Sequence, residues 1–468
     1  MRRARHHTTR PRHRIPVVAC LAISSLLVVA APAAELRRSP YLMAPRPQGM
    51  TVLWRTDDSV RHTAVLRYGR DPDKLDMVVQ ARENLRHFPG CRDWQADLRD
   101  LEPDTLYFYA VECDRAVLCG ADDRHCFRTA PLPGTRRPLR FLTLGDSGSN
   151  RPRPDPIEAV LAEKGPIESI GVRNGFRIWN KGRPLDGIVL LGDNAYPAGT
   201  DEQYQASFFN VYADELACTP VWPCTGNHDI DDAFRHIFPV AGRGLSGGVK
   251  SNSPYYYAAD IGQLHLVVLD PWRTWLNETP DPGHAPWRKQ VAWLESDLAA
   301  TEQPWIVVAQ HFPLYCGGDY HSDDEPLTQV RRQLLPIFDR FGVDLSLAGH
   351  DHTFQRTYLL HGLAGPSDTY DPAVHRKSPS DGRTAPITKR RGRDGGTVHV
   401  VSGMGGGSRR AKKFAHPAMV PIDGALGTSR PGNLVIEIDG DRLTGTLVDM
   451  EGRETDRFTL VHEQHDAP

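Results

Sequence analysis

The sequence predicts an N-terminal antiparallel β-sandwich followed by an α/β sandwich of the α-β-β-α type. Three observations support this fold class. Short segments rich in β-branched and aromatic residues fill the first part of the chain, with Gly, Pro and Asp turns between them. From Leu139 onward, apolar runs typical of buried parallel strands alternate with segments of helical periodicity. Polar clusters follow five of these runs, where an open α/β sheet holds its ligands.

Residues 1–33 have the pattern of a signal peptide. Six arginines precede an uncharged apolar stretch from Ile15 to Ala34, and Ala31-Pro32-Ala33 has the A-x-A form of a cleavage site. The alternative is an uncleaved anchor, because the uncharged stretch could just span a bilayer. We expect cleavage and export, hence a secreted or periplasmic protein with no stable membrane span afterwards.

The charge of the exported chain argues against some classes of partner. The 468 residues carry a formal charge of −2, which becomes −8 once the six arginines of the leader are removed. Such a chain has no electrostatic footprint for nucleic acid or an anionic membrane. In an oxidising compartment the seven remaining cysteines predict disulfides, with at least one thiol unpaired because the number is odd.

Residues 39–131 form the predicted β-sandwich domain, and 131–138 the linker that follows it. Strands are expected over Thr51–Trp54, Ala64–Tyr68 and Leu106–Val111. The segment Leu101–Tyr107 resembles the tyrosine corner of fibronectin type III domains. This domain either packs against the rest of the chain, the interpretation we favour, or acts as a module that shapes the binding cleft or binds a surface.

Residues 138–462 form the predicted α/β domain. Apolar stripes at helical spacing predict helices before the strands that begin at Trp305 and Val343. Residues 364–396 are polar and aperiodic, which predicts a flexible surface insertion. Its basic run Lys389–Arg393 is expected to be a solvated loop, with an anion-attracting rim as the alternative. A strand and a Gly-rich turn follow over Thr397–Gly407, and closing strands fill Gly432–Leu460.

The chemistry lies in the five polar clusters. Carboxylate, amide, phenol and imidazole groups without cysteine suit one or two first-row metal ions that keep open positions. In chain order the clusters are Gly145-Asp146-Ser147-Gly148, Gly192-Asp193-Asn194-Ala195-Tyr196, Gly226-Asn227-His228-Asp229, Gln310-His311 and Gly349-His350-Asp351-His352.

At these residues the chain resembles the calcineurin-like metallophosphoesterases, and among them the purple acid phosphatases. The family pattern is GDxG, GDxxY, GNH with an acid, VxxH and GHxH, and all five motifs occur here in order. The resemblance implies a dinuclear site in which Asp193 bridges two metals. It places Asp146, Asp193, Tyr196 and His352 around one metal, and Asp193, Asn227, His311 and His350 around the other.

The resemblance also implies metals and catalytic groups. Tyr196 implies Fe(III) at one site, with Zn, Fe or Mn at the other. His228 and His321 are candidates for substrate contact and proton donation, since the family keeps a histidine ten residues past His311. Its usual neighbouring histidine is Tyr320 here.

Two further departures are Asp229 in place of a common glutamate and Gln355 in place of another. These departures affect the expected subfamily and substrate, while the metal ligands are complete. The implied function is hydrolysis of small-molecule phosphate monoesters by attack of a metal-bound hydroxide, as in acid phosphatases. A phosphodiesterase or nucleotide pyrophosphatase on the same scaffold is the first alternative. A surface-binding protein with an inert metal site is the second.

Overall fold

A computed structural model describes Met1 and residues 34–58, 63–84, 88–148, 167–239, 245–276, 284–407, 416–422 and 425–463. The expected signal peptide, apart from Met1, lies outside the described residues. Within the described ranges, no helix is both long and apolar enough to cross a membrane.

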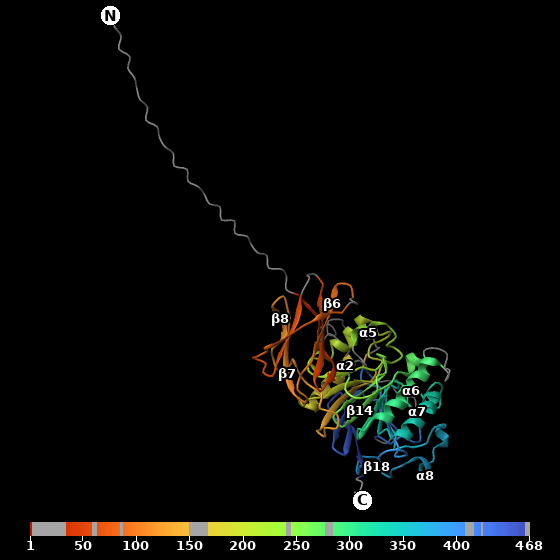
Figure 1. The fold of residues 1–468 in the computed structure, drawn as a ribbon. Coiled ribbons are helices and arrows are strands. Elements are labelled where there is room, and N and C mark those ends of the chain that lie inside the picture. Colours follow the sequence, from red (N-terminus) through yellow and green to blue (C-terminus); the bar gives the residue numbers. More distant parts are fainter. Residues whose placement is uncertain are drawn as a thin grey trace. The chain divides into compact units, whose positions relative to one another are not determined.

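The N-terminal part is an antiparallel β-sandwich, as predicted (Figure 1). Its core is aromatic, with Trp54, Trp94, Tyr109 and Phe127 buried between the layers. The Oη atom of Tyr107 accepts a hydrogen bond from the backbone N–H of Glu102 at 3.1 Å, the contact expected of a tyrosine corner. One layer contains β1 (Leu36–Arg46), β2 (Gly49–Asp57), β6 (Cys91–Leu98) and β5 (Arg82–Glu83), and the other β4 (Met77–Gln80), β3 (Ala64–Gly69), β7 (Leu106–Cys113) and β8 (Ala116–Gly120), with β9 (Cys126–Arg128) paired to β7.

Two sheets form the centre of the α/β part. The first is part of an eleven-stranded sheet, whose strands follow the order β18-β22-β21-β20-β10-β11-β12-β1-β2-β6-β5. The second has six strands in the order β13-β14-β15-β16-β19-β17. The strands of the first are β10 (Leu139–Leu144), β11 (Gly187–Leu190), β12 (Pro220–Trp222), β18 (Ile387–Lys389), β20 (Gly432–Asp439), β21 (Arg442–Asp449) and β22 (Glu454–His462). Those of the second are β13 (Tyr257–Ile261), β14 (Leu264–Val268), β15 (Trp305–Ala309), β16 (Leu345–Ala348), β17 (Phe354–Arg356) and β19 (Val398–Ser402).

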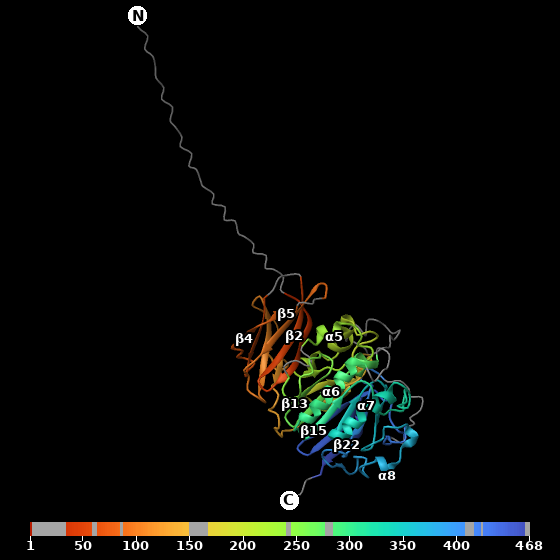
Figure 2. The ribbon, with the colours of Figure 1, turned by 45° about the vertical axis from the view of Figure 1, so that its right-hand side comes forward.

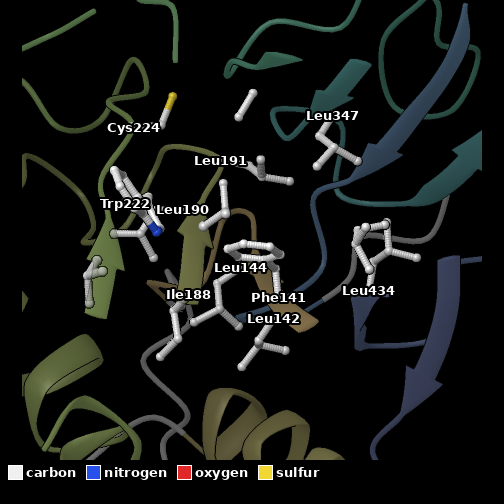
Figure 3. Close-up of a cluster of buried hydrophobic side chains, with 14 of the residues drawn as sticks. Phe141, Leu142, Leu144, Ile188, Leu190, Leu191, Trp222, Cys224, Leu347 and Leu434 are labelled. Atoms are coloured by element: carbon white, nitrogen blue, oxygen red, sulfur yellow. The ribbon is translucent and has the colours of Figure 1, made fainter. Parts of the chain in front are cut away.

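The two sheets share one apolar core, and helices cover their outer faces. Figure 3 shows Phe141, Ile188 and Trp222 of the first sheet in the same buried cluster as Leu347 of the second. Helix α2 (Ile167–Asn180) packs on β20 and β21, while α6 (Ala285–Ala300) and α7 (Leu327–Phe341) cover the six-stranded sheet (Figure 2). This arrangement confirms the expected α-β-β-α sandwich. The remaining helices are short: α3 (Asp201–Tyr204), η1 (Gln205–Phe209), α4 (Ala213–Leu216), α5 (Ala233–Ile237), η2 (Trp272–Leu276), η3 (Ser367–Thr369) and α8 (Pro372–His375).

The β-sandwich shares a sheet with the α/β part, which the sequence did not indicate. Strand β1 pairs in parallel with β12, so one layer of the sandwich extends the eleven-stranded sheet. Next to this junction, the buried Asp201 carboxylate forms ion pairs with Arg38, whose Nη2 atom lies 2.8 Å from Asp201 Oδ1, and with Arg55. The pairing leaves the Asp201 carboxylate compensated, which a buried charge requires.

The segment 364–396 differs from the sequence-based expectation at one point. It contains α8 and β18, and β18 pairs with β22 at the end of the eleven-stranded sheet. The Lys389 side chain is fully buried. Its Nζ atom lies 2.6 Å from Asp344 Oδ1 and donates hydrogen bonds to the carbonyls of Gly342 and Val343. The prediction of a solvated loop is therefore wrong for Lys389, because a carboxylate and two carbonyls replace water around its charge.

The seven cysteines also differ from expectation, since all are free in the structure. Cys224 and Cys316 are fully buried, Cys224 in the core between the sheets and Cys316 beneath helices α6 and α7. They behave as small apolar residues that fill the core.

Candidate metal centre

Five strands deliver the candidate ligands to one edge of the two sheets. Asp146, Asp193 and Asn227 follow β10, β11 and β12, while His311 and His350 follow β15 and β16. Asp146, Asp193 and His350 have positive φ angles of 52°, 52° and 69°, a conformation that non-glycine residues adopt only where the surroundings impose it.

Close packing of the loops imposes these conformations. The backbone N–H of Asp146 donates to the carbonyl of Gly192 at 2.9 Å. A Cβ atom at Gly226 would overlap the Asp193 carboxylate, and one at Gly349 would overlap that of Asp146. Only glycine allows the backbone to approach the two carboxylates so closely.

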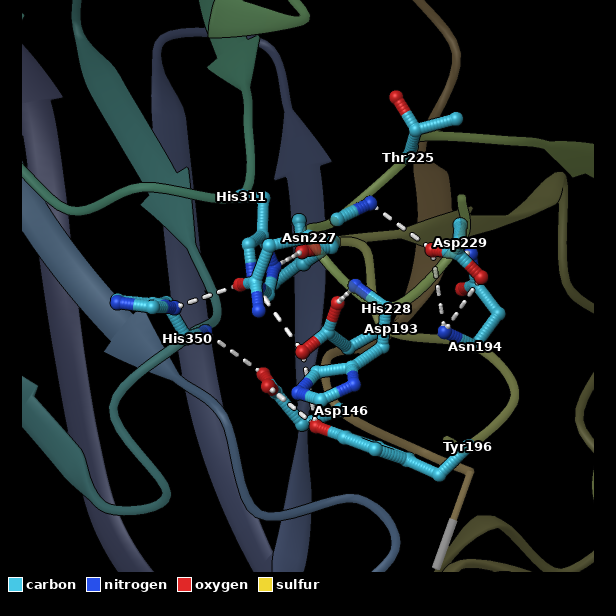
Figure 4. Close-up of polar contacts among 12 residues, drawn as sticks. Asp146, Asp193, Asn194, Tyr196, Thr225, Asn227, His228, Asp229, His311 and His350 are labelled. Carbon is cyan, nitrogen blue, oxygen red and sulfur yellow. Dashed lines mark hydrogen bonds and ion pairs between the residues drawn. The ribbon is translucent and has the colours of Figure 1, made fainter. Parts of the chain in front are cut away.

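Tyr196 is the centre of one group of side chains (Figure 4). Its Oη atom lies 3.1 Å from Asp146 Oδ1, 3.0 Å from Asp193 Oδ2 and 3.1 Å from His352 Nε2. His352 Nε2 also lies 3.3 Å from Asp146 Oδ1. Two carboxylates, a phenol and an imidazole therefore converge on one point.

Asn227 is the centre of a second, adjacent group. Its Oδ1 atom lies 3.0 Å from His311 Nε2 and 3.1 Å from His350 Nδ1. Asp193 belongs to both groups, because its Oδ2 atom also lies 3.4 Å from His311 Nε2. All seven sequence-predicted ligands are thus together, and ligand atoms of Asp146, Asp193 and His311 lie within 4.8 Å of one another.

The electrostatics of the centre follow from burial and mutual contact. Burial alone would raise the pKa of Asp193, but the neighbouring His311 outweighs it and holds that pKa below its usual range. Burial by itself would lower the pKa of His311, but the nearby charge of Asp193 acts in the opposite direction. The net result is a pKa raised to about 9. Burial, together with the carboxylates of Asp146 and Asp193, raises the pKa of the Tyr196 phenol well above its ordinary value. Each carboxylate is thus stabilised by a proton-bearing neighbour.

The donor set fits metal ions. Oxygen and imidazole nitrogen ligands suit first-row metals, and the ion-pair partners of Asp146 and Asp193 in the structure are histidines. The Nδ1–H group of His311 donates to the Leu191 carbonyl at 2.9 Å, which leaves Nε2 for the centre. A backbone contact of this kind fixes the tautomer and ring orientation of a metal-binding histidine.

Two buried carboxylates support the ligand loops. Asp229 accepts hydrogen bonds from Asn194 Nδ2 at 3.0 Å, the Gly226 N–H at 2.8 Å and Tyr204 Oη at 2.6 Å. It therefore ties the loop that contains Asp193 to the loop that contains Asn227.

Asp351 supports the loop that contains His321, a role the sequence analysis missed. It accepts from the backbone N–H groups of Gly318, Asp319 and Tyr320 at 3.1, 3.2 and 3.4 Å. Gln355 assists, because its Oε1 atom accepts from the Gly317 N–H at 2.9 Å. The signal in the sequence was the position of Asp351 between two candidate ligands, His350 and His352.

The structure places the two candidate catalytic histidines differently. The His228 N–H donates to Asp193 Oδ1 at 2.7 Å, and the His228 ring lies 4.5 Å from that of Tyr196, so this residue borders the centre. The contacts described for His321 lie in its own loop and with His416, whose ring centroid is 6.0 Å away. The link between the His321 loop and the centre is the neighbouring residue Tyr320, whose ring stacks on that of His350 with the centroids 4.3 Å apart.

Comparison with protein families agrees with this geometry. Residues 139–354 match the calcineurin-like phosphoesterase model, and residues 40–129 match the model of the purple acid phosphatase N-terminal domain. The chain therefore combines a purple acid phosphatase N-terminal domain with a calcineurin-like phosphoesterase domain. This phosphoesterase is accordingly a hydrolase acting on phosphoric ester bonds.

Curated relatives cover much of the chain at low identity. Purple acid phosphatase 21 of Arabidopsis thaliana is 27% identical over 66% of this phosphoesterase and 63% of its own length. Tartrate-resistant acid phosphatase type 5 of Mus musculus is 28% identical over 54% and 79%. An uncharacterized protein of Mycobacterium tuberculosis is 26% identical over 79% and 69%.

Solved structures support the fold. Purple acid phosphatase PPD1 from yellow lupin (Lupinus luteus) seeds matches with a TM-score of 0.66 at 18% identity, over 91% of this chain and 74% of its own. The structure of PhoD matches with a TM-score of 0.55 at 12% identity, over 92% and 90%.

Proposed function

We propose that this phosphoesterase is an exported phosphomonoesterase of the acid phosphatase type with a dinuclear metal centre. The observation that carries the proposal is the position of Asp193 Oδ2, 3.0 Å from Tyr196 Oη and 3.4 Å from His311 Nε2. One carboxylate oxygen thus faces both groups of ligands, as a bridge between two cations requires. Names of relatives such as the Arabidopsis and mouse acid phosphatases favour the same activity.

In this proposal the two groups of side chains are two metal sites. Asp146, Asp193, Tyr196 and His352 would hold Fe(III), while Asp193, Asn227, His311 and His350 would hold Zn, Fe or Mn. When bound, the metals would provide an activated nucleophile in mildly acidic solution and offset charge on the phosphoryl oxygens.

His228 contacts the phosphoryl group. Its Nδ1–H donates to the Pro197 carbonyl at 2.8 Å, and when both ring nitrogens carry hydrogen, Nε2–H is the donor available to a phosphoryl oxygen. Its backbone bond to Asp193 keeps it beside the bridging carboxylate.

His321 gives a proton to the leaving alcohol. In the neutral ring Nδ1 accepts from the Asp323 N–H at 3.2 Å, so the proton lies on Nε2. The Asp323 carboxylate lies 3.6 Å from Nδ1. A histidine suits this role because it can be protonated in mildly acidic solution.

The remaining parts of the chain have simpler roles in the proposal. Residues 1–33 direct export, and 39–131 form a domain that packs against the catalytic domain at 138–462. The shared sheet through β1 and β12 favours such a packing role for the N-terminal domain. Within the catalytic domain, 364–396 remains a proposed insertion. The substrate is a small phosphoester, and the mildly acidic charge disfavours nucleic acid.

One experiment tests the function. Purified enzyme is assayed on p-nitrophenyl phosphate and bis(p-nitrophenyl) phosphate, with metal content measured in the same preparation. We expect faster hydrolysis of the monoester and two metal ions per chain. A faster diester rate would favour the phosphodiesterase alternative, whereas two bound metals with no activity on either ester would favour the inert, surface-binding alternative.

A further inference from the structure

An aromatic stack ends at the metal centre. The Tyr320 ring lies parallel to that of His350, with centroids 4.3 Å apart and an interplanar angle of 14°. Phe312 contacts His350 at 4.4 Å, and Trp272 stacks on Phe312 at 5.8 Å. Phe312 is buried, whereas Tyr320 is 39% exposed. The stack therefore presents an aromatic side chain to solvent directly beside a metal-binding histidine.

The backbone around Tyr320 is held firmly. Its N–H donates to Asp351 Oδ2 at 3.4 Å, and the two preceding N–H groups donate to the same carboxylate at 3.1 and 3.2 Å. A hydrogen bond to Gln355 fixes the start of the loop at Gly317. Because the loop is anchored on the segment that contains His350, the ring position is set before any ligand arrives, which reduces the entropy lost on binding.

The position of this ring suggests what it contacts. If a phosphoryl group binds at the metal centre, the rest of its ester extends outward from the ligands, and Tyr320 is an exposed side chain in direct contact with one of them, His350. A flat aromatic group offers such a ring a stacking partner, whereas an aliphatic alcohol does not. Replacing an aromatic side chain that stacks on a base with alanine lowers affinity by about 5- to 150-fold.

We propose that Tyr320 forms a stacking subsite that selects phosphomonoesters with a flat ring, such as nucleoside 5′-monophosphates. The proposal rests on the phosphomonoesterase function proposed above. It also assigns Tyr320 a positioning role, because the ring covers one face of His350.

Two substrates with the same leaving group test the subsite. Adenosine 5′-monophosphate and ribose 5-phosphate both release a primary alcohol, so a difference in kcat/KM reports contact with the base. We expect the wild type to prefer the nucleotide. Tyr320→Phe should keep this preference, and Tyr320→Leu and Tyr320→Ala should reduce it about tenfold through the KM for the nucleotide. Because the Tyr320 ring also packs on His350, replacing it is expected to change the rate on both substrates, and the ratio of the two kcat/KM values is therefore the quantity that reports the subsite.

A matched control is Tyr370→Ala, which removes a ring that stacks on His375 at 6.2 Å, away from the proposed ligands. It should leave the preference unchanged. Inhibition by adenosine gives a second measurement, expected to be strong in the wild type and weak in Tyr320→Leu.

The outcomes separate the two proposals. A wild type that hydrolyses both substrates without preference, or Tyr320→Leu and Tyr320→Ala variants that retain the preference, would overturn the subsite alone. Inactivity of metal-loaded wild type on both substrates would overturn the phosphomonoesterase function itself. If Tyr320→Ala loses metal, the Leu and Phe variants decide.

Discussion

His399 should make this protein less stable in acid. It lies on β19 with 4% exposure, and neither ring nitrogen has a hydrogen-bond partner among the described residues. The Tyr315 ring is 4.7 Å away. Burial, with a contribution from Arg331, lowers the pKa of His399 to about 3. The folded protein therefore keeps this ring neutral at pH values where the unfolded chain protonates it.

The magnitude follows from the two pKa values. An unfolded histidine has a pKa of ~6.5, so below pH ~6.5 the unfolded state binds a proton that the folded state does not. The free energy of unfolding then falls by ~1.4 kcal/mol per pH unit, until the pH approaches the folded pKa of about 3. Between pH 8 and pH 5, His399 should account for a loss of ~2 kcal/mol.

Urea unfolding of wild type and His399→Leu at pH 8 and pH 5 tests this value. We expect the wild type to lose ~2 kcal/mol more than the variant between the two pH values. Contributions from the metal centre cancel in this comparison if both proteins carry the same metals. His375→Leu, at a partly buried histidine on α8, is the control and should follow the wild type. Equal losses in wild type and His399→Leu would refute the reasoning.

Three further predictions concern the metal centre. Asp193→Asn should release both metals, because a neutral amide cannot bridge two cations, whereas Asn227→Ala should mainly empty one site. The measurement is the metal content per chain. Two metals held at native affinity in Asp193→Asn would refute the bridging role of Asp193. His321→Ala should reduce hydrolysis of alkyl phosphates by ~10²–10⁴-fold and largely spare p-nitrophenyl phosphate, whose leaving group needs little protonation. Equal losses on the two substrates would indicate a binding role instead. The concentrated enzyme should absorb visible light through Tyr196 bound to Fe(III), and Tyr196→Phe should abolish the colour; a colourless active enzyme without iron would contradict this assignment.

The sequence alone was sufficient for the layers of the fold and for the convergence of the candidate metal ligands. Buried parallel strands read as short apolar runs, and their carboxyl ends lie at one edge of a sheet. Asp146, Asp193, Asn227, His311 and His350 follow such runs, so their convergence could be predicted without coordinates. Helices α6 and α7 were predictable for a similar reason, because their apolar spacing is a local property of the chain.

Only the tertiary structure revealed how distant segments compensate one another. Lys389 read as part of a solvated loop, but its partner Asp344 lies on another segment, and burial of the pair depends on how β18 joins the sheet. Asp351 is an ordinary acidic residue in the sequence until the loop before His321 folds onto it. Strand periodicity shows which face is buried, but pairing between β1 and β12 depends on contacts across more than 170 residues. The sequence by itself determined which groups the site contains, because those signals are local. Tertiary structure decided which residues support these groups, because hydrogen bonds and ion pairs between distant segments do not produce a periodic pattern in the sequence.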